Sequence, residues 1–239
     1  MIRTAYMVFG RFQPPTSGHA TLLTDLKMQA DKVAAEHFVI PTQSQTKPPK
    51  RIMDCKERSE KVENPLNIDQ KMTYLRLMFP TLTIVDPRTR KQNIRTIFDA
   101  ANWLHDEGFR GLVLVVGSDR VAEFTKIMAQ GNGQWIESFD FINVVQGGAR
   151  GTNADPNKVS GTQMRRAACM GDFAKFKTHV HIGNMTDNEV FELMTVVREG
   201  SGMSGMSGMS GGNRRSGSNR RRPHLKPIPE ELRDLVCIE

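Results

Sequence analysis

The sequence predicts an α/β domain with a parallel, doubly wound sheet and helices on both faces, followed by a flexible basic tail. Short apolar runs typical of buried strands alternate with helical patterns along the first 199 residues. Such alternation favours parallel strands joined by right-handed helical crossovers. The 239 residues suffice for one such domain with an appendage. We therefore expect a Rossmann-like fold with a five-stranded sheet.

Five segments have the composition of strands. The segments 4–10 and 111–117 are apolar almost throughout, as expected of parallel strands that are covered on both faces. The predicted strands span residues 4–10, 37–44 (with the loop that follows), 81–87, 111–117 and 139–145.

Helical periodicity and capping residues predict seven helices in the domain. Asn67 and Ser160 are suitable N-caps, and Pro80 is a helix stop. The polar stretch 45–64 is too long for a tight connection and is predicted to be a mobile loop over the active site. The predicted helices span residues 18–35, 65–80, 93–106, 119–128, 160–170, 172–178 and 186–198.

The composition predicts three regions. Residues 1–199 form the domain, residues 200–212 form a Gly/Ser/Met linker, and residues 213–239 form a basic tail with a short amphipathic helix near 229–236. The net charge is +7 and the pI is about 9.5, which favours anionic partners. Because the run 214–226 contains no acidic residue, residues 213–226 are a candidate contact for nucleic acid or an acidic partner.

The remaining composition indicates a soluble, cytoplasmic protein. Mean hydropathy is -0.44, and no apolar run approaches the length of a membrane span. Arg3 leads directly into a strand, so no signal peptide is expected. The three cysteines are scattered and lack metal-ligand spacing, so we expect reduced thiols and no protein-built metal site.

The stretch GRFQPPTSGH, residues 10–19, is the strongest functional signal. It joins a buried strand to a helix that opens at Gly18 and His19. The first N–H groups of a helix have no partner within that helix, and the helix dipole favours negative charge there. We expect Gly10 to leave room for a nucleotide and the N-terminus of the helix to hold phosphate.

Three motifs together resemble the nucleotidyltransferase superfamily. GRFQPPTSGH resembles its first signature, GxFxPxHxGH; VSGTQMR, residues 159–165, resembles its late motif ISSTxxR; and LVLVVGSD, residues 112–119, is similar to its strand ending in GSD. The combination of the segments GRFQP and SGTxxRR is most similar to archaeal-type nicotinamide mononucleotide adenylyltransferases and to nucleotidyltransferase-like proteins of bacteriophages. The resemblance covers roughly residues 4–180.

The resemblance implies roles for particular residues. His19, Thr16 and Arg165 would be catalytic: His19 and Arg165 would stabilise charge on the phosphates, and Thr16 would donate a hydrogen bond in place of the family's first histidine. Each has a structural alternative, namely a helix cap for His19, a turn for Thr16 and a solvated charge for Arg165. The implied nucleotide-binding residues are Gly10, Arg11, Phe12, Gln13, Gly18, Gly117, Asp119, Ser160 and Thr162.

The implied reaction is transfer of a nucleoside monophosphate, preferably AMP from ATP, to a phosphorylated acceptor such as nicotinamide mononucleotide, with release of pyrophosphate. Mg²⁺ would be held mainly through the substrate phosphates. Two alternatives stay open: a cytidylyltransferase on the same fold, and a nucleic-acid-binding or virion-associated protein that uses the basic tail. The resemblance also allows a homo-oligomer and, for a viral protein, residence in the host cytoplasm.

Overall fold

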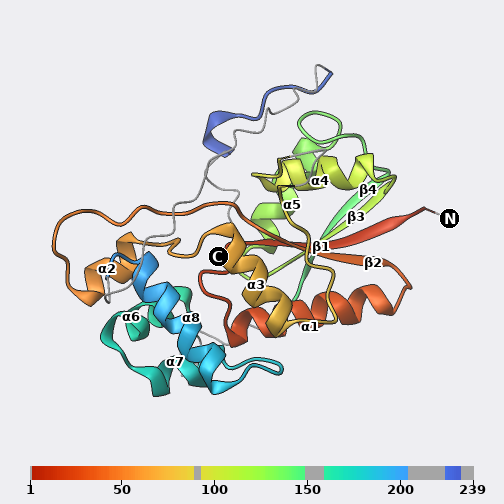
Figure 1. Ribbon diagram of the computed structural model, residues 1–239. Coiled ribbons are helices and arrows are strands. Elements are labelled where there is room, and N and C mark those ends of the chain that lie inside the picture. The colour runs from red at the N-terminus through yellow and green to blue at the C-terminus, as the bar shows by residue number, and fades with distance from the viewer. Residues whose placement is uncertain (1, 89–92, 149–158, 204–223, 233–239) are drawn as a thin grey trace.

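The computed structural model describes residues 2–88, 93–148, 159–203 and 224–232. Its centre is a four-stranded parallel sheet in the order β2-β1-β3-β4 (Figure 1). The strands are β1 (Thr4–Gly10), β2 (Glu36–Pro41), β3 (Gly111–Val116) and β4 (Phe141–Gln146). The helices are α1 (Ser17–Asp31), α2 (Cys55–Lys61), α3 (Ile68–Met78), α4 (Ile97–Asp106), α5 (Val121–Gly131), α6 (Gly161–Met170), α7 (Phe173–Val180) and α8 (Asp187–Gly200).

Helices cover both faces of the sheet, as predicted. Alternate residues of β1 point to opposite faces: Met7 and Phe9 pack with α4 and α5, whereas Val8 packs with α1. Every residue of β3 is buried, which explains its continuous apolar sequence. A third cluster joins α3 to α6, α7 and α8. These last three helices and α2 gather at the end of the sheet opposite the N-terminus (Figure 1).

The prediction of a fifth strand over residues 81–87 is wrong. Among the described residues, this segment makes only an isolated parallel bridge between Ile84 and Val39. The N–H of Val39 donates to the carbonyl of Thr83, and the N–H of Val85 donates to the carbonyl of Val39. The next two donors of this ladder would be residues 41 and 87, both of which are proline and lack an N–H. The ladder therefore stops after one bridge.

Segment 45–64 contains a short helix, α2, within the predicted loop. Asp54 caps α2 by accepting from the N–H of Glu57 at 2.8 Å. The predicted caps Asn67 and Ser160 are confirmed, and each forms a capping box. None of the helices in the described ranges combines the length and apolar character needed to cross a bilayer.

Segment 224–232 returns to the domain. The N–H of Lys226 donates to the carbonyl of Gln134 at 2.7 Å, and Ile228 and Leu232 pack against the core beneath α4 and α5. Its only regular structure within the described residues is a 3-10 turn, Glu230–Leu232, in the region where a short helix was predicted. Most of the linker and the run 213–223 lie outside the described residues, so the three-region division stays a prediction.

Candidate active site

The loop between β1 and α1 turns its aromatic residue inward. Phe12 has a left-handed backbone (φ 49°) and a fully buried side chain. A Cβ added to Gly10 would lie 3.0 Å from the Phe12 ring. Gly10 is therefore needed to admit this ring, a reason that differs from the predicted clearance for a nucleotide. Any contact of Phe12 with a nucleotide would involve its main chain.

His19 is held in a defined orientation at the start of α1. The N–H of Thr16 donates to Nδ1 of His19 at 3.1 Å, and the Thr16 hydroxyl lies 2.9 Å from the same nitrogen. Because Nδ1 is the acceptor, the neutral ring carries its proton on Nε2. The imidazole also packs against Phe12, with ring centroids 5.0 Å apart. Thr16 itself is buried. The imidazole of His19 is partly exposed, so its Nε2–H can donate a hydrogen bond to a phosphate oxygen.

Arg165 is buried, with 7% of its surface exposed, and connects three segments. Its Nη1 donates to the carbonyl of Gln13 at 2.9 Å, and its Nε donates to the carbonyl of Ser59 in α2 at 3.0 Å. Nη2 donates to the Thr162 hydroxyl at 2.9 Å. The guanidinium of the late motif thus places a fixed positive charge against the first motif. Because Arg165 is buried, the alternative of a solvated surface arginine does not hold.

The N-terminus of α6 packs closely against the same loop. Ser160 caps the helix by accepting from the N–H of Gln163 at 3.2 Å. A Cβ added to Gly161 would lie 2.9 Å from the Gln13 carbonyl oxygen. A Cβ on Gly18, near the start of α1, would lie 3.8 Å from the Val159 carbonyl. The N-termini of α1 and α6 are therefore neighbours, and their dipoles favour an anion between them.

Two predicted nucleotide-binding side chains contact protein groups in this structure. The amide of Gln13 is buried; it donates to the carbonyl of Leu66 and accepts from the N–H of Leu66, both at 2.8 Å. Arg11 donates to Glu63 at 2.7 Å. Both pairs fasten the first loop to the segment before α3. Gln13 and Arg11 therefore shape the loop, and their contact with nucleotide stays a prediction.

Gly117 and Asp119 lie at the carboxyl end of β3. Gly117 is buried, Asp119 is exposed, and the N–H of Arg120 donates to the Gly117 carbonyl at 2.9 Å before α5 begins. The carboxyl ends of β1 and β3 are adjacent because the strands pair, and the chain reverses its direction of winding between them. Ligands of doubly wound sheets bind at this switch point. The strand order places the first motif and the motif after β3 at one end of the sheet, and the hydrogen bond from Arg165 to Gln13 brings the late motif to the same end.

Lys71 is a polar residue of this region that the sequence analysis missed. Its side chain is fully buried in α3, and Nζ donates to the carbonyls of Thr42 and Ser44 at 2.7 and 3.1 Å. The N–H of Thr42 donates in turn to the carbonyl of Gly10. A lysine on the buried stripe of the helix, one turn before Leu75, was the available signal. Lys71 fixes the turn after β2 beside the loop between β1 and α1.

The cysteines depart from the expectation of reduced thiols. Cys55 and Cys169 form a disulfide between α2 and α6, with a Cα–Cα distance of 5.6 Å. Cys237 lies outside the described residues. In the part of the chain that the structure describes, no group of three or more His, Cys, Asp or Glu side chains is arranged to hold a metal ion.

One family model matches most of the chain, including all three motifs. The model of the cytidylyltransferase-like family matches residues 7–167. A nicotinic acid mononucleotide adenylyltransferase from Plasmodium falciparum, solved with APC, is 11% identical (TM-score 0.48; 81% of this chain and 97% of that chain covered). A putative nicotinate-nucleotide adenylyltransferase from Vibrio parahaemolyticus is 14% identical (TM-score 0.43; 83% and 97% covered).

A macrolide-efflux protein from Streptococcus pneumoniae is 15% identical (TM-score 0.43; 75% of this chain and 55% of that chain covered). No curated protein sequence matches the chain significantly. Because every one of these TM-scores is below 0.5, the assignment depends on the family match, which spans both the first and the late motif. The chain belongs to the cytidylyltransferase-like family and is a nucleotidyltransferase.

Proposed function

We propose that the protein transfers AMP from ATP to a phosphorylated acceptor, with nicotinamide mononucleotide as the first candidate, and releases pyrophosphate. The observation that carries this proposal is the junction of α1 and α6, where His19 and Arg165 flank two adjacent helix N-termini. Such a junction suits a triphosphate because N–H groups, helix dipoles and a guanidinium all favour anionic oxygens. The preference for ATP and for this acceptor comes from the resemblance of the segments GRFQP and SGTxxRR to archaeal-type nicotinamide mononucleotide adenylyltransferases.

The reaction needs no general base from the protein. An anionic phosphate oxygen of the acceptor attacks the α-phosphorus in line, and the bond from that phosphorus to the bridging oxygen of pyrophosphate breaks. Catalysis is then positioning combined with stabilisation of the charge on the leaving group. Nε2–H of His19 and the N-termini of the two helices supply that stabilisation, and Arg165 holds the loop that orients them.

Mg²⁺ remains part of the proposal. The junction supplies N–H donors, a guanidinium and an imidazole, which suit phosphate oxygens, and no cluster of carboxylates among the described residues is arranged to hold a metal ion. The ion would therefore be held by the triphosphate, and it would neutralise phosphate charge when bound.

Pyrophosphate release tests the proposal directly. The full chain is incubated with Mg²⁺, each of the four nucleoside triphosphates and a panel of phosphorylated acceptors headed by nicotinamide mononucleotide. Release with ATP and this acceptor alone would support the proposed substrate pair. Release with CTP and another acceptor would keep the chemistry and replace both substrates. Absence of release with every pair, in a folded protein that binds nucleotide, would favour a binding function that uses the basic residues 213–226.

A further inference from the structure

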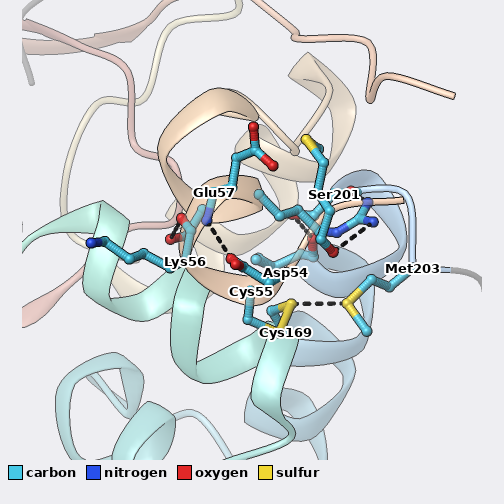
Figure 2. Close-up of a disulfide and its surroundings, with 11 residues drawn as sticks. Asp54, Cys55, Lys56, Glu57, Cys169, Ser201 and Met203 are labelled. Atoms are coloured by element: carbon cyan, nitrogen blue, oxygen red, sulfur yellow. Dashed lines mark hydrogen bonds between the residues drawn. A yellow bond between two sulfur atoms is a disulfide. The ribbon is translucent and has the colours of Figure 1, made fainter. Parts of the chain in front are cut away.

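The disulfide joins the late-motif helix to the inserted segment between β2 and α3. Figure 2 shows Cys55 at the start of α2 bonded to Cys169 of α6, with Met203 beside it. Sδ of Met203 lies 2.9 Å from Sγ of Cys169. Because a disulfide sulfur carries no hydrogen, this is a sulfur–sulfur contact. The covalent bond therefore fixes α2 against the face of α6 that carries Cys169.

A hydrogen bond between Arg165 of α6 and Ser59 of α2 joins the same two helix faces. Ser59 is four residues after Cys55, and Cys169 is four residues after Arg165, so each pair lies on one face of its helix. The carbonyl of Ser59 accepts from Nε of Arg165 at 3.0 Å. The disulfide and this hydrogen bond are thus adjacent connections across a single interface between helices.

A further contact joins α2 to the segment that follows α8. Nη1 of Arg58 donates to the carbonyl of Ser201 at 2.6 Å, directly after α8, and Arg58 is buried. The segment carrying α2 contributes no other helix to the domain. The disulfide, Arg58 and the Ser59 carbonyl hold α2 against α6 and α8, together with the buried side chain of Val62 directly after the helix.

We propose that α2 is the positioning element for Arg165 and that the Cys55–Cys169 pair makes nucleotide binding sensitive to oxidation state. This inference builds on the proposed function, since Arg165 is assigned to the nucleotide site. In the oxidised protein, α2 keeps the Ser59 carbonyl on Nε, and the guanidinium keeps its hydrogen bond to Gln13. Reduction removes the covalent bond, so α2 moves more freely and the order of Arg165 and of the Gln13 loop decreases.

The chemistry is an ordinary thiol–disulfide exchange. Oxidation breaks two S–H bonds and forms the S–S bond, while a small-molecule disulfide accepts two electrons and two protons and becomes two thiols. Reduction by a dithiol is the reverse. Cys169 is buried, whereas Cys55 is partly exposed, so we expect an incoming thiolate to attack the sulfur of Cys55.

The test compares the oxidised and reduced full chain. The thiols are counted by mass after alkylation with iodoacetamide, ATP affinity is measured by calorimetry, and amide hydrogen exchange is followed at Thr16 and along α6. Reduction, or Cys55→Ser, is expected to weaken ATP binding about 10-fold, because the charge-assisted hydrogen bond of Arg165 to Ser59 weakens. Exchange at Thr16 is expected to rise as well. Cys237→Ser, which leaves the pair intact, should behave like the oxidised wild type.

The variant Arg165→Ala tests whether the disulfide acts by positioning Arg165 or only by stabilising the fold. In this variant, reduction should change neither ATP affinity nor exchange at Thr16, because the connecting guanidinium is absent. Equal affinity and equal exchange in oxidised and reduced wild type, even with a lower thermal midpoint after reduction, would overturn the inference. The exchange measurement needs no ligand, so failure of the proposed function, seen as no turnover with any substrate pair, is distinguished from failure of this inference.

Discussion

The carbonyl oxygen of Gln13 accepts a hydrogen bond of 2.9 Å from Nη1 of Arg165, a residue 152 positions later in the sequence. This bond joins the first motif to the late motif. It also accounts for the burial of Arg165, since a buried guanidinium requires acceptors in fixed positions. The two motifs are thus parts of one assembled structure.

Arg165→Ala should lower kcat/KM for pyrophosphate release roughly 10²–10³-fold, because it removes both a positive charge and the support of the loop between β1 and α1. It should also lower the thermal midpoint, since three acceptors lose their donor. Arg166→Ala is the matched control, because Arg166 is exposed in the same helix. Equal kinetics for the two variants would contradict the role assigned to Arg165.

His19→Ala should lower kcat on the order of 10²–10³-fold if Nε2–H stabilises the leaving pyrophosphate. KM for the triphosphate should change less, because the helix N-termini remain. His105→Ala serves as a control, since α4 lies on the opposite face of the sheet from α1. The kinetics of pyrophosphate release check this, and an unchanged kcat would exclude His19 from the chemistry.

Gly161→Ala tests the packing of α6 against the first loop. The new methyl group would lie 2.9 Å from the Gln13 carbonyl oxygen and 3.0 Å from Nη1 of Arg165. The loop must move, so we expect a loss of stability of about 1–3 kcal/mol and weaker triphosphate binding. Gly18→Ala is the comparison, because its Cβ would meet nothing closer than 3.7 Å. Urea unfolding of both variants measures the difference, which should be absent if α6 and the loop are not in contact.

Local patterns predicted much of the fold and little of the connections between segments. The apolar run of β3 and the cap at Ser160 are signals carried by a few consecutive residues, and the structure confirms both. The prediction of a fifth strand failed because the hydrogen-bond ladder next to β2 would need N–H groups from Pro41 and Pro87. The pairing of these two segments cannot be recognised from either segment alone. The bond between Cys55 and Cys169 likewise depends on how α2 and α6 pack.

Within the site, sequence patterns located the motifs but not the partners of their side chains. Phe12 and Gln13 belong to the motif, yet their side chains point inward to Gly10 and Leu66. Lys71 was missed because a lysine on a helix is usually solvated. Such directions are set by contacts between segments distant in the sequence, which a single sequence does not contain.

Lys71→Met should destabilise the protein by about 2–4 kcal/mol, because the carbonyls of Thr42 and Ser44 lose a buried charged donor. The turn after β2 should then be less ordered, with higher KM for the triphosphate. Lys175→Met, on an exposed position of α7, is the control. Urea unfolding combined with steady-state kinetics checks both effects. A stable variant with unchanged KM would show that Lys71 supports neither the fold nor the site.

Stability should fall as pH decreases from 7 towards 5. Burial lowers the pKa of His37, helped by the nearby Lys27 charge, and burial also lowers the pKa of His105, helped by Arg110. The unfolded chain therefore binds protons at its ordinary pKa of about 6.5, before the folded chain does. The stabilisation is present above that pKa and is lost as pH falls through the lower folded values. The carboxylate of Asp86, whose pKa is lowered by Arg88, titrates only in a more acidic range.

The free energy of unfolding in urea, measured from pH 5 to 8, checks this dependence. The double variant His37→Gln/His105→Gln should show a shallower slope between pH 5 and 7, because it removes two groups that bind protons more readily in the unfolded state. His37 should account for a clear part of the slope of the unfolding free energy against pH, since its buried Nε2 has no hydrogen-bond partner among the described residues. An unchanged slope in the double variant would mean that other groups cause the loss of stability.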